Sequence, residues 1–370
     1  MNASRWDSGS QRIEAARLVR AIRTIIAAGG STDAEADHVA ESLVESNLQG
    51  HDSHGIGIVP RYVAALLDGG LRANRQPRVT LDLAALVAVD GQQGYGQVIG
   101  DAAMRLAIAR AREAGSCVMA LANTHHLGRI GQFAELAVAA GLVSMHFVNV
   151  LSRPIVAAWG GADARFGTNP CCIGIPLPGE PPMILDFATS VAAQGKLRVA
   201  HNNGQAAPPG VLLDNHGRPT TDPRFAVIAP LGALLPFGEH KGYGLAIACE
   251  LLGGALTGGG TEHGAAPPDL RVQNGMLTIL VDPRRLGTAD AFARDSRAFL
   301  GWLRQSRPAA GVDRVRVPGE PEREARERRS AEGIPVDAAT WREIADAAAR
   351  LGIARDALDA LANIIPRSGI

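Results

Sequence analysis

The sequence predicts an α/β protein, and the order of its apolar segments carries that prediction. From Pro77 onward, short apolar runs typical of strands alternate with amphipathic helical stretches, which is the pattern of an α/β core. The glycine fingerprint GxGxxG is absent, because Gly94 to Gly100 is one residue too long in its last gap and Gly128 to Gly131 is too short. Any nucleotide site would therefore belong to a fold other than the Rossmann fold.

The first 75 residues predict an all-helical unit. Apolar residues recur at helical spacing from Arg12 to Ala28 and stop at two glycines. A second helix begins at Ser31 and runs to about Leu48, and a third spans Pro60 to Leu67. We therefore expect an N-terminal helical unit over residues 1–75.

The remaining elements follow from periodicity and turn residues. We expect strands at 79–81, 86–89, 117–122, 142–150, 172–175, 183–185 and 276–281, and helices at 100–114, 131–140, 189–199, 244–256, 291–305, 338–351 and 356–364. Residues 203–236 are rich in Pro, Gly, Asn and Asp and predict a long loop with at most brief strands. The predicted division is thus 1–75, an α/β core over 76–306, and a linker with C-terminal helices over 307–370 that packs back on the N-terminal unit.

Composition excludes some classes of function. The 370 residues include 37 basic and 37 acidic side chains, so there is no basic excess for nucleic acid. The one charged run, Glu320 to Arg329, mixes both signs and predicts a solvated helix. Neither an apolar signal-peptide core nor a window of about 18 apolar residues is present. The four cysteines lack CxxC spacing and predict buried thiols in a reducing cytoplasm.

The most polar stretch is Gly50 to Gly57, GHDSHGIG. It places two imidazoles, a carboxylate and a hydroxyl in four consecutive positions, a density that suits proton transfer. The alternative is a polar loop between two helices, in which Asp52 or Ser53 caps the second helix.

Four further polar clusters stand at the ends of predicted elements. They are Asn123–Arg129, Phe166–Pro170, Ile184–Ser190 and Glu239–Gly244. Each alone is compatible with a cap or a turn, but five such loops together are typical of a catalytic site. The pair His125-His126 lacks the spacing and carboxylate partners of a zinc site, so we expect no metal.

The motifs DSHGIG, NTHHLGRIG, FGTNP, LDFATS and EHKGYGLA occur in the same order in a known family. With them, the chain resembles the malate/L-lactate dehydrogenases of the second type from about Arg12 to Ile364. Within that family it is most similar to the hydroxycarboxylate dehydrogenase B subgroup, which shares HDSHGIG, HHxGRIG and a late segment seen here as Val317 to Glu320. The resemblance implies a non-Rossmann mixed-sheet core with N- and C-terminal helices.

The resemblance also implies hydride transfer between NAD(H) and the second carbon of a 2-hydroxy or 2-oxo acid, such as malate, lactate or a larger, aromatic acid. Such a reaction needs a proton donor, a carboxylate anchor and a positioned nicotinamide. His54 and His126 match the histidines implicated in proton transfer and cofactor contact, without a division of roles, and Ser53 and Asn123 would orient them. NADP(H) is the alternative cofactor, and a homodimer is implied.

By the same matching, a set of residues would line the cofactor. They are His54, Gly128, Arg129, Ile130, Asn169, Ile184, Leu185, Asp186, Phe187, Ala188, His240, Lys241, Gly319, Glu320, Pro321 and Glu322.

One position departs from the family. Many members carry an arginine that holds the substrate carboxylate four residues after the SHG histidine, and Ile58 stands there. Arg61 or Arg129 would take over, because a guanidinium offers a bidentate fork to a carboxylate. A more apolar pocket would favour larger or aromatic acids over malate. The alternatives are an imine reductase or ureidoglycolate-type dehydrogenase of the same family, or an inactive ligand-binding homologue.

Overall fold

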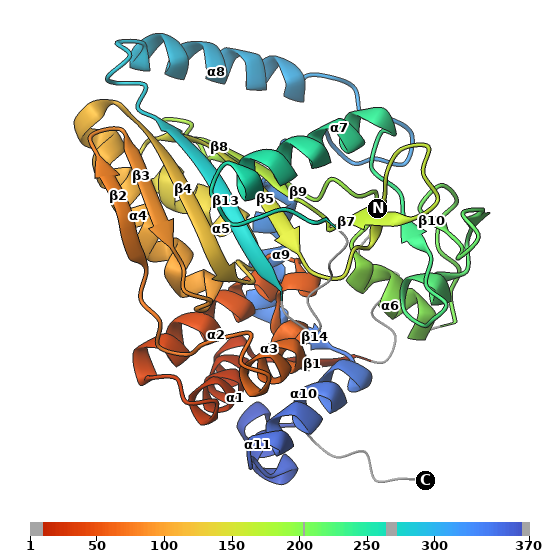
Figure 1. Ribbon diagram of the computed structural model, residues 1–370. Coiled ribbons are helices and arrows are strands. Elements are labelled where there is room, and N and C mark those ends of the chain that lie inside the picture. The colour runs from red at the N-terminus through yellow and green to blue at the C-terminus, as the bar shows by residue number, and fades with distance from the viewer. Residues whose placement is uncertain (1–9, 203, 264–271, 365–370) are drawn as a thin grey trace. The chain divides into compact units, whose positions relative to one another are not determined.

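The computed structural model describes residues 10–202, 204–263 and 272–364. The chain divides into two compact units, a helical unit (Met1–Arg75 with Pro321–Ile370) and a sheet unit (Gln76–Glu320), both drawn in Figure 1. The first nine residues, on which the expectation of no signal peptide rests, lie outside the described part, and that expectation stays a prediction.

The helical unit consists of α1 (Ala15–Ala28), α2 (Asp33–Leu48), α3 (Val59–Leu67), α9 (Glu320–Glu332), α10 (Ala338–Arg350) and α11 (Arg355–Ala362). Its amphipathic helices pack α1 on α2 and α11, and α10 on α3. The Thr32 hydroxyl caps α2 by accepting from the Glu35 backbone N–H, and the Asp337 carboxylate caps α10. Segments from both ends of the chain therefore build this unit.

The predicted start of the first helix was wrong. Residues Gln11–Ile13 form a strand, β1, that pairs antiparallel with β14 (Ile334–Val336). Helical periodicity cannot reveal a strand partner that lies more than 300 residues away in the sequence. α1 therefore begins only at Ala15.

The sheet unit is built on a seven-stranded mixed sheet. Its order is β2 (Arg78–Leu83), β3 (Leu86–Asp90), β4 (Ser116–His125), β13 (Gln273–Val281), β5 (Val143–Leu151), β8 (Cys171–Ile175) and β9 (Met183–Phe187). Only β3 and β4 are parallel, so the sheet differs from the parallel sheet of a Rossmann fold. The predicted α/β, non-Rossmann fold class is confirmed.

Two helices cover one face of this sheet, which we call the covered face (Figure 1). They are α4 (Gly96–Ala114) and α5 (Gly131–Ala139), and they pack on β4, β5, β8, β9 and β13. Between them and the strands lies a continuous buried core that includes Met119, Phe133, Val148, Met276 and Leu280.

The opposite face of the sheet, which we call the open face, is also apolar. Side chains alternate along a strand, so the strand registers assign its members. They are Leu81, Leu83, Leu86, Ala88, Val118, Ala120, Val143, Met145, Phe147, Ile173, Ile175, Met183, Leu185, Leu277, Ile279 and Val281. All except Leu277 keep part of their surface exposed, and Leu83 is 54% exposed.

Helix α7 (His240–Cys249) continues as a π-helix, η5 (Glu250–Ala255), which contacts β5 and β13. The sequence predicted one helix over 244–256, so both the start and the π-helical end differ. Gly253 allows the contact, because a Cβ there would lie 2.7 Å from the Asn149 backbone nitrogen and the Phe147 carbonyl oxygen. A π-helix has about one more residue per turn than an α-helix, and this places Gly253 against β5.

A smaller five-stranded sheet completes the unit, together with α6 (Gln194–Asn202), η4 (Pro223–Ala226) and α8 (Ala289–Arg304). Its strand order is β11 (Pro219–Thr220), β10 (Leu212–Leu213), β12 (Ala233–Leu234), β6 (Val156–Ala157) and β7 (Ala164–Phe166). Three of these strands are two-residue segments within 203–236, as the sequence predicted. No described helix is both long and apolar enough to cross a membrane.

Candidate active site

The stretch GHDSHGIG follows α2 in the helical unit and forms two short 3-10 turns, η2 (Asp52–His54) and η3 (Ile56–Ile58). The Ser53 Oγ lies 3.0 Å from the His54 Nδ1, so the hydroxyl fixes one ring nitrogen. The alternative in which Asp52 or Ser53 caps α3 is wrong, because the capping position is Ile58 and no side chain bonds there.

Asn47, a buried residue near the end of α2, holds this loop. Its Oδ1 accepts from the Ile56 backbone N–H at 2.8 Å, and its Nδ2 donates to the Asp52 Oδ1 at 2.6 Å. A Cβ on Gly55 would lie 2.1 Å from the Asn47 Oδ1. The glycine is therefore required by this close approach.

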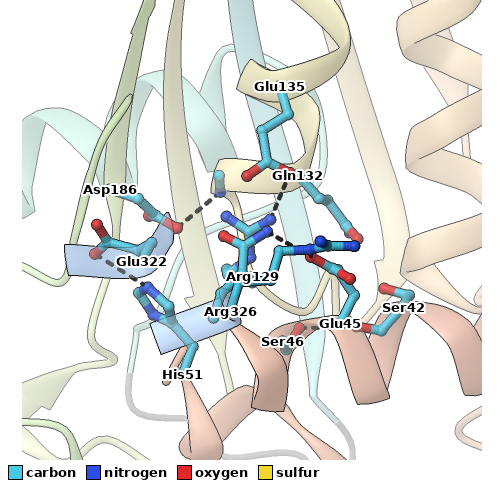
Figure 2. Close-up of polar contacts among 12 residues, drawn as sticks. Ser42, Glu45, Ser46, His51, Arg129, Gln132, Glu135, Asp186, Glu322 and Arg326 are labelled. Carbon is cyan, nitrogen blue, oxygen red and sulfur yellow. Dashed lines mark hydrogen bonds and ion pairs between the residues drawn. The ribbon is translucent and has the colours of Figure 1, made fainter. Parts of the chain in front are cut away.

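Helix α9 holds the loop from a distant part of the sequence. The Arg329 guanidinium donates to both Asp52 carboxylate oxygens, at 2.7 and 2.9 Å, and to the Asn47 carbonyl. The Glu322 Oε1 lies 3.5 Å from the His51 Nε2, as Figure 2 shows. The prediction of a merely solvated helix for this charged run was incomplete, because these side chains contact the His51–Asp52 segment.

In the sheet unit, β4 continues through His125 instead of ending at residue 122. Asn123 adopts a left-handed backbone (φ 58°) within it. Its Oδ1 accepts from the Gln273 Nε2 at 3.0 Å, and its Nδ2 donates to the Asp90 Oδ1 at 3.4 Å. Burial opposes the ionised Asp90, yet the Gln92 backbone N–H and Arg78 outweigh it and hold the pKa of this carboxyl below its usual value.

The two adjacent histidines have different environments. His125 is buried, whereas His126 is half-buried just beyond the strand. The Asn274 Oδ1 accepts from the Leu127 N–H at 2.9 Å, and a Cβ on Gly96 would lie 2.4 Å from the His126 carbonyl oxygen. The backbone around His126 is therefore fixed by a hydrogen bond and by the close approach of α4.

Arg129 and Asp186 meet at the start of α5 (Figure 2). The buried Arg129 guanidinium pairs with Glu135 at 2.6 Å, and the Gly131 backbone N–H donates to the Asp186 Oδ2 at 2.7 Å. A Cβ on Gly131 would lie 2.2 Å from the Arg129 Nη1. Gly128, with φ 78°, makes the turn before them, and Ile130 is buried.

The other expected cofactor residues fall into three places. Asn169 is fully buried and ties β5 to α7, because it accepts from the Val150 N–H and donates to the Ala246 carbonyl and to Glu250. His240 and Lys241 are exposed at the start of α7, and the Trp159 ring lies 5.5 Å from the His240 ring.

The third place is the β9 edge. The Ile184 N–H bonds to the Pro318 carbonyl at 3.4 Å, which brings residues 184–188 beside the Gly319 turn. Glu320 pairs with Arg304 and Arg314 at 3.3 and 3.1 Å. Leu185, Phe187 and Ala188 are half-buried, and Pro321 and Glu322 belong to the helical unit.

Sequence reasoning missed the residues that hold these side chains in place. Asn47, Gln273 and Asn274 stand near the ends of their elements, where polar side chains are ordinary, so they carry no distinct local signal. Arg329 carries no local signal, because its partner is 277 residues away. Within the described residues, no cluster of three or more His, Cys, Asp or Glu side chains is placed to bind a metal.

Comparisons with known proteins identify the family of the chain. The family model described as malate/L-lactate dehydrogenase matches residues 13–345. Hydroxycarboxylate dehydrogenase B of Escherichia coli K12 is 44% identical over 352 residues, 94% of this chain and 97% of the relative. L-lactate dehydrogenase of Cupriavidus necator is 40% identical over 334 residues, 90% and 95% of the two chains.

A solved structure from Escherichia coli, described as a candidate malate/lactate dehydrogenase, superposes with a TM-score of 0.91 at 43% identity and covers 95% of this chain and 99% of its own. Other matched relatives are named sulfolactate dehydrogenase and Δ1-pyrroline-2-carboxylate/Δ1-piperideine-2-carboxylate reductase, so the substrates named within the family vary. The chain belongs to the malate/L-lactate dehydrogenase family and is a dehydrogenase by that membership.

Proposed function

We propose that this protein interconverts 2-hydroxy and 2-oxo carboxylic acids with NAD(H) as its cofactor. The observation that carries the proposal is the contact between Ser53 and His54. Histidine is the side chain that exchanges protons near neutral pH, and here its Nδ1 is held by the Ser53 hydroxyl. Family membership supplies the reaction class.

The side chains in the sheet unit fit a nicotinamide dinucleotide. Lys241 and His240 are exposed at the first turn of α7, where the lysine charge and the helix dipole favour a phosphate anion. We propose that they, with Gly128–Ile130, Asn169, Ile184–Ala188, Gly319 and Glu320, hold the cofactor. The bound nicotinamide supplies or accepts a hydride at the second carbon of the acid.

We assign His54 the proton transfer at the substrate oxygen. In this arrangement Nδ1–H donates to the Ser53 Oγ, and Nε2 gives a proton during reduction and takes one during oxidation. His126 would contact the cofactor or share the proton transfer, and Asn123, held by Gln273, would orient it.

For the substrate carboxylate we favour Arg61 over Arg129. The Arg129 side chain is only 2% exposed and already pairs with Glu135, so a substrate would have to displace a buried ion pair. Arg61 is exposed on α3, three residues after Ile58. Ile58 is itself apolar and 8% exposed, which supports larger or aromatic 2-oxo acids over oxaloacetate.

We propose a homodimer in which a second copy covers the open face of the sheet. A partly exposed apolar surface with members on seven strands, three of them exposed on β2 and β3, is unusual for a monomer. The same uncharged patch on both subunits can pair about a twofold axis. The four buried, free thiols support residence in the reducing cytoplasm.

The test is absorbance at the reduced-nicotinamide band, with NADH or NADPH and a panel of pyruvate, oxaloacetate, 2-oxoglutarate and hydroxyphenylpyruvate. We expect oxidation of NADH that is fastest with the aromatic acid and is lost in His54→Ala. A preference for oxaloacetate contradicts the proposed pocket. Turnover only of cyclic imines or ureidoglycolate indicates those family activities, and cofactor binding without any turnover indicates an inactive homologue.

A further inference from the structure

Three charged side chains on one side of α9 form ion pairs with residues of α2 and of the loop that follows it. Glu322, Arg326 and Arg329 follow one another at intervals of four and three residues, so they lie on one side of the helix. They contact His51, Glu45 and Asp52 respectively, which places this side of α9 against the end of α2 and the loop after it. Figure 2 shows the first two of these pairs.

We propose that Arg329, acting through Asp52 and Asn47, is a positioning residue for His54. This inference rests on the proposed role of His54 in proton transfer. A side chain from the C-terminal part of the chain then sets the orientation of the imidazole and thereby the rate of the chemical step.

The contacts form a continuous chain around the histidine. Arg329 binds both oxygens of Asp52, and the Asp52 Oδ1 also accepts from the Asn47 Nδ2. The Asn47 Oδ1 in turn accepts from the Ile56 N–H. Asp52 and Ile56 each stand two residues from His54, so the loop is held on both sides of the imidazole.

Polar contacts hold the η2 part of this loop, whereas the buried Ile56 anchors the turn that follows. None of the three residues of η2 is buried. The groups that bind the loop are well shielded, because the Arg329 side chain is 12% exposed and Asn47 is 4% exposed. The Asp52 side chain is 51% exposed, so the shielding lies on the arginine side of the pair. A bidentate guanidinium–carboxylate pair restrains both distance and angle, which a lysine at the same position cannot do.

Arg326 offers a matched control on the same helix. It pairs with Glu45 at 2.7 Å, and the two side chains are 54% and 34% exposed. An exposed pair of this kind contributes less than about 1 kcal/mol. Replacing either arginine by lysine keeps the charge of α9, so the two variants differ in the geometry that they remove.

The experiment compares Arg329→Lys with Arg326→Lys in the full-length enzyme. We measure kcat, the KM for NADH, the solvent deuterium isotope effect on kcat, and hydrogen–deuterium exchange of residues 50–57. Because misplacing a catalytic group by about 1 Å costs up to about 100-fold, we expect Arg329→Lys to lower kcat by about 10- to 100-fold. The KM for NADH should change less than about twofold, while the isotope effect and the exchange rate both rise.

The isotope effect separates positioning from folding. A smaller fraction of folded enzyme lowers kcat but leaves the isotope effect of the remaining molecules unchanged, and that result would overturn the proposal. Equal effects of Arg326→Lys, or unchanged kcat in Arg329→Lys, would also overturn it. If the wild-type enzyme reduces none of the acids, the proposed function fails instead, and exchange at 50–57 still reports whether Arg329 holds the loop.

Discussion

The two faces of the seven-stranded sheet have similar side chains but different surroundings. On the covered face, α4 and α5 bury residues such as Met276 and Leu280 completely. On the open face, the neighbours of these residues on the same strand, Ile279 and Val281, are equally apolar but keep part of their surface exposed. Adjacent positions on β13 therefore experience opposite environments within one element.

Strand composition alone therefore does not show which face of a sheet is covered by helices of the same chain. A sheet that is wet on one face normally alternates apolar and polar residues, and β13 does not. A run that is apolar on both faces is typical of a strand buried on both sides. The sequence of β13 is thus consistent with a partner on the open face, which the proposed second copy supplies.

The largest effect is expected from a charge on the open face. Ile279→Lys should convert a dimer into a monomer, because an unpaired buried ammonium costs at least about 4 kcal/mol and weakens association about 1,000-fold or more. Light scattering during size-exclusion chromatography measures the mass. A wild-type protein that is monomeric at micromolar concentration would contradict the comparison directly, as would a variant that remains dimeric.

A truncation on the covered face should be costly within one chain. Leu280→Ala removes a completely buried side chain from the core under α4 and α5, and we expect a loss of about 2 to 5 kcal/mol in the free energy of unfolding. Urea denaturation of Leu280→Ala and Ile279→Ala at two protein concentrations measures it. The Leu280 loss should be present at both concentrations, whereas the Ile279 loss should depend on concentration. Equal dependence for both variants would remove the distinction between the faces.

The covered face also contains a buried imidazole. Burial lowers the pKa of His146 to about 3, and its Nδ1 lies 2.9 Å from the Thr278 Oγ1. The unfolded chain binds a proton below its ordinary value near 6.5, so stability is full above that pH and falls as the pH decreases toward 3. At pH 5 the loss is about 2 kcal/mol. Urea melts at pH 7 and 5 should show it in the wild type and not in His146→Gln.

The features that the sequence predicted depend on local contacts, whereas those that it did not predict depend on contacts between distant segments of the chain. The strands and helices of the core were predictable because periodicity and turn residues are local. The polar clusters, including Ser53-His54, could be noticed because each is dense within a few residues, but residues 123–125 and 184–187 lie in strands and not in loops. The pairing of β1 with β14 and the contact of Arg329 with Asp52 were not, because each joins segments about 280 or more residues apart.

The residues around the clusters were missed for a second reason. Gln273 and Asn274 look like an ordinary strand start, and only the structure shows that their amides reach Asn123 and the backbone after His126. The π-helical end of α7 was equally hidden, since a helix period of 3.6 residues fits residues 244–256 as well. Local pattern thus finds the candidate reactive groups, while the tertiary structure shows which residues hold them in place.

The smallest effect is expected on the solvent side of the covering helix. Arg105 pairs with Asp101 one turn earlier on α4 at 2.6 Å, but the arginine side chain is 68% exposed. Arg105→Ala should therefore change the free energy of unfolding by less than about 0.5 kcal/mol, because solvent and salt screen such pairs. Urea melts of Arg105→Ala beside Leu280→Ala measure the ratio. A loss above about 1.5 kcal/mol in Arg105→Ala would mean that charge pairing, and not only apolar contact, holds α4 on the sheet.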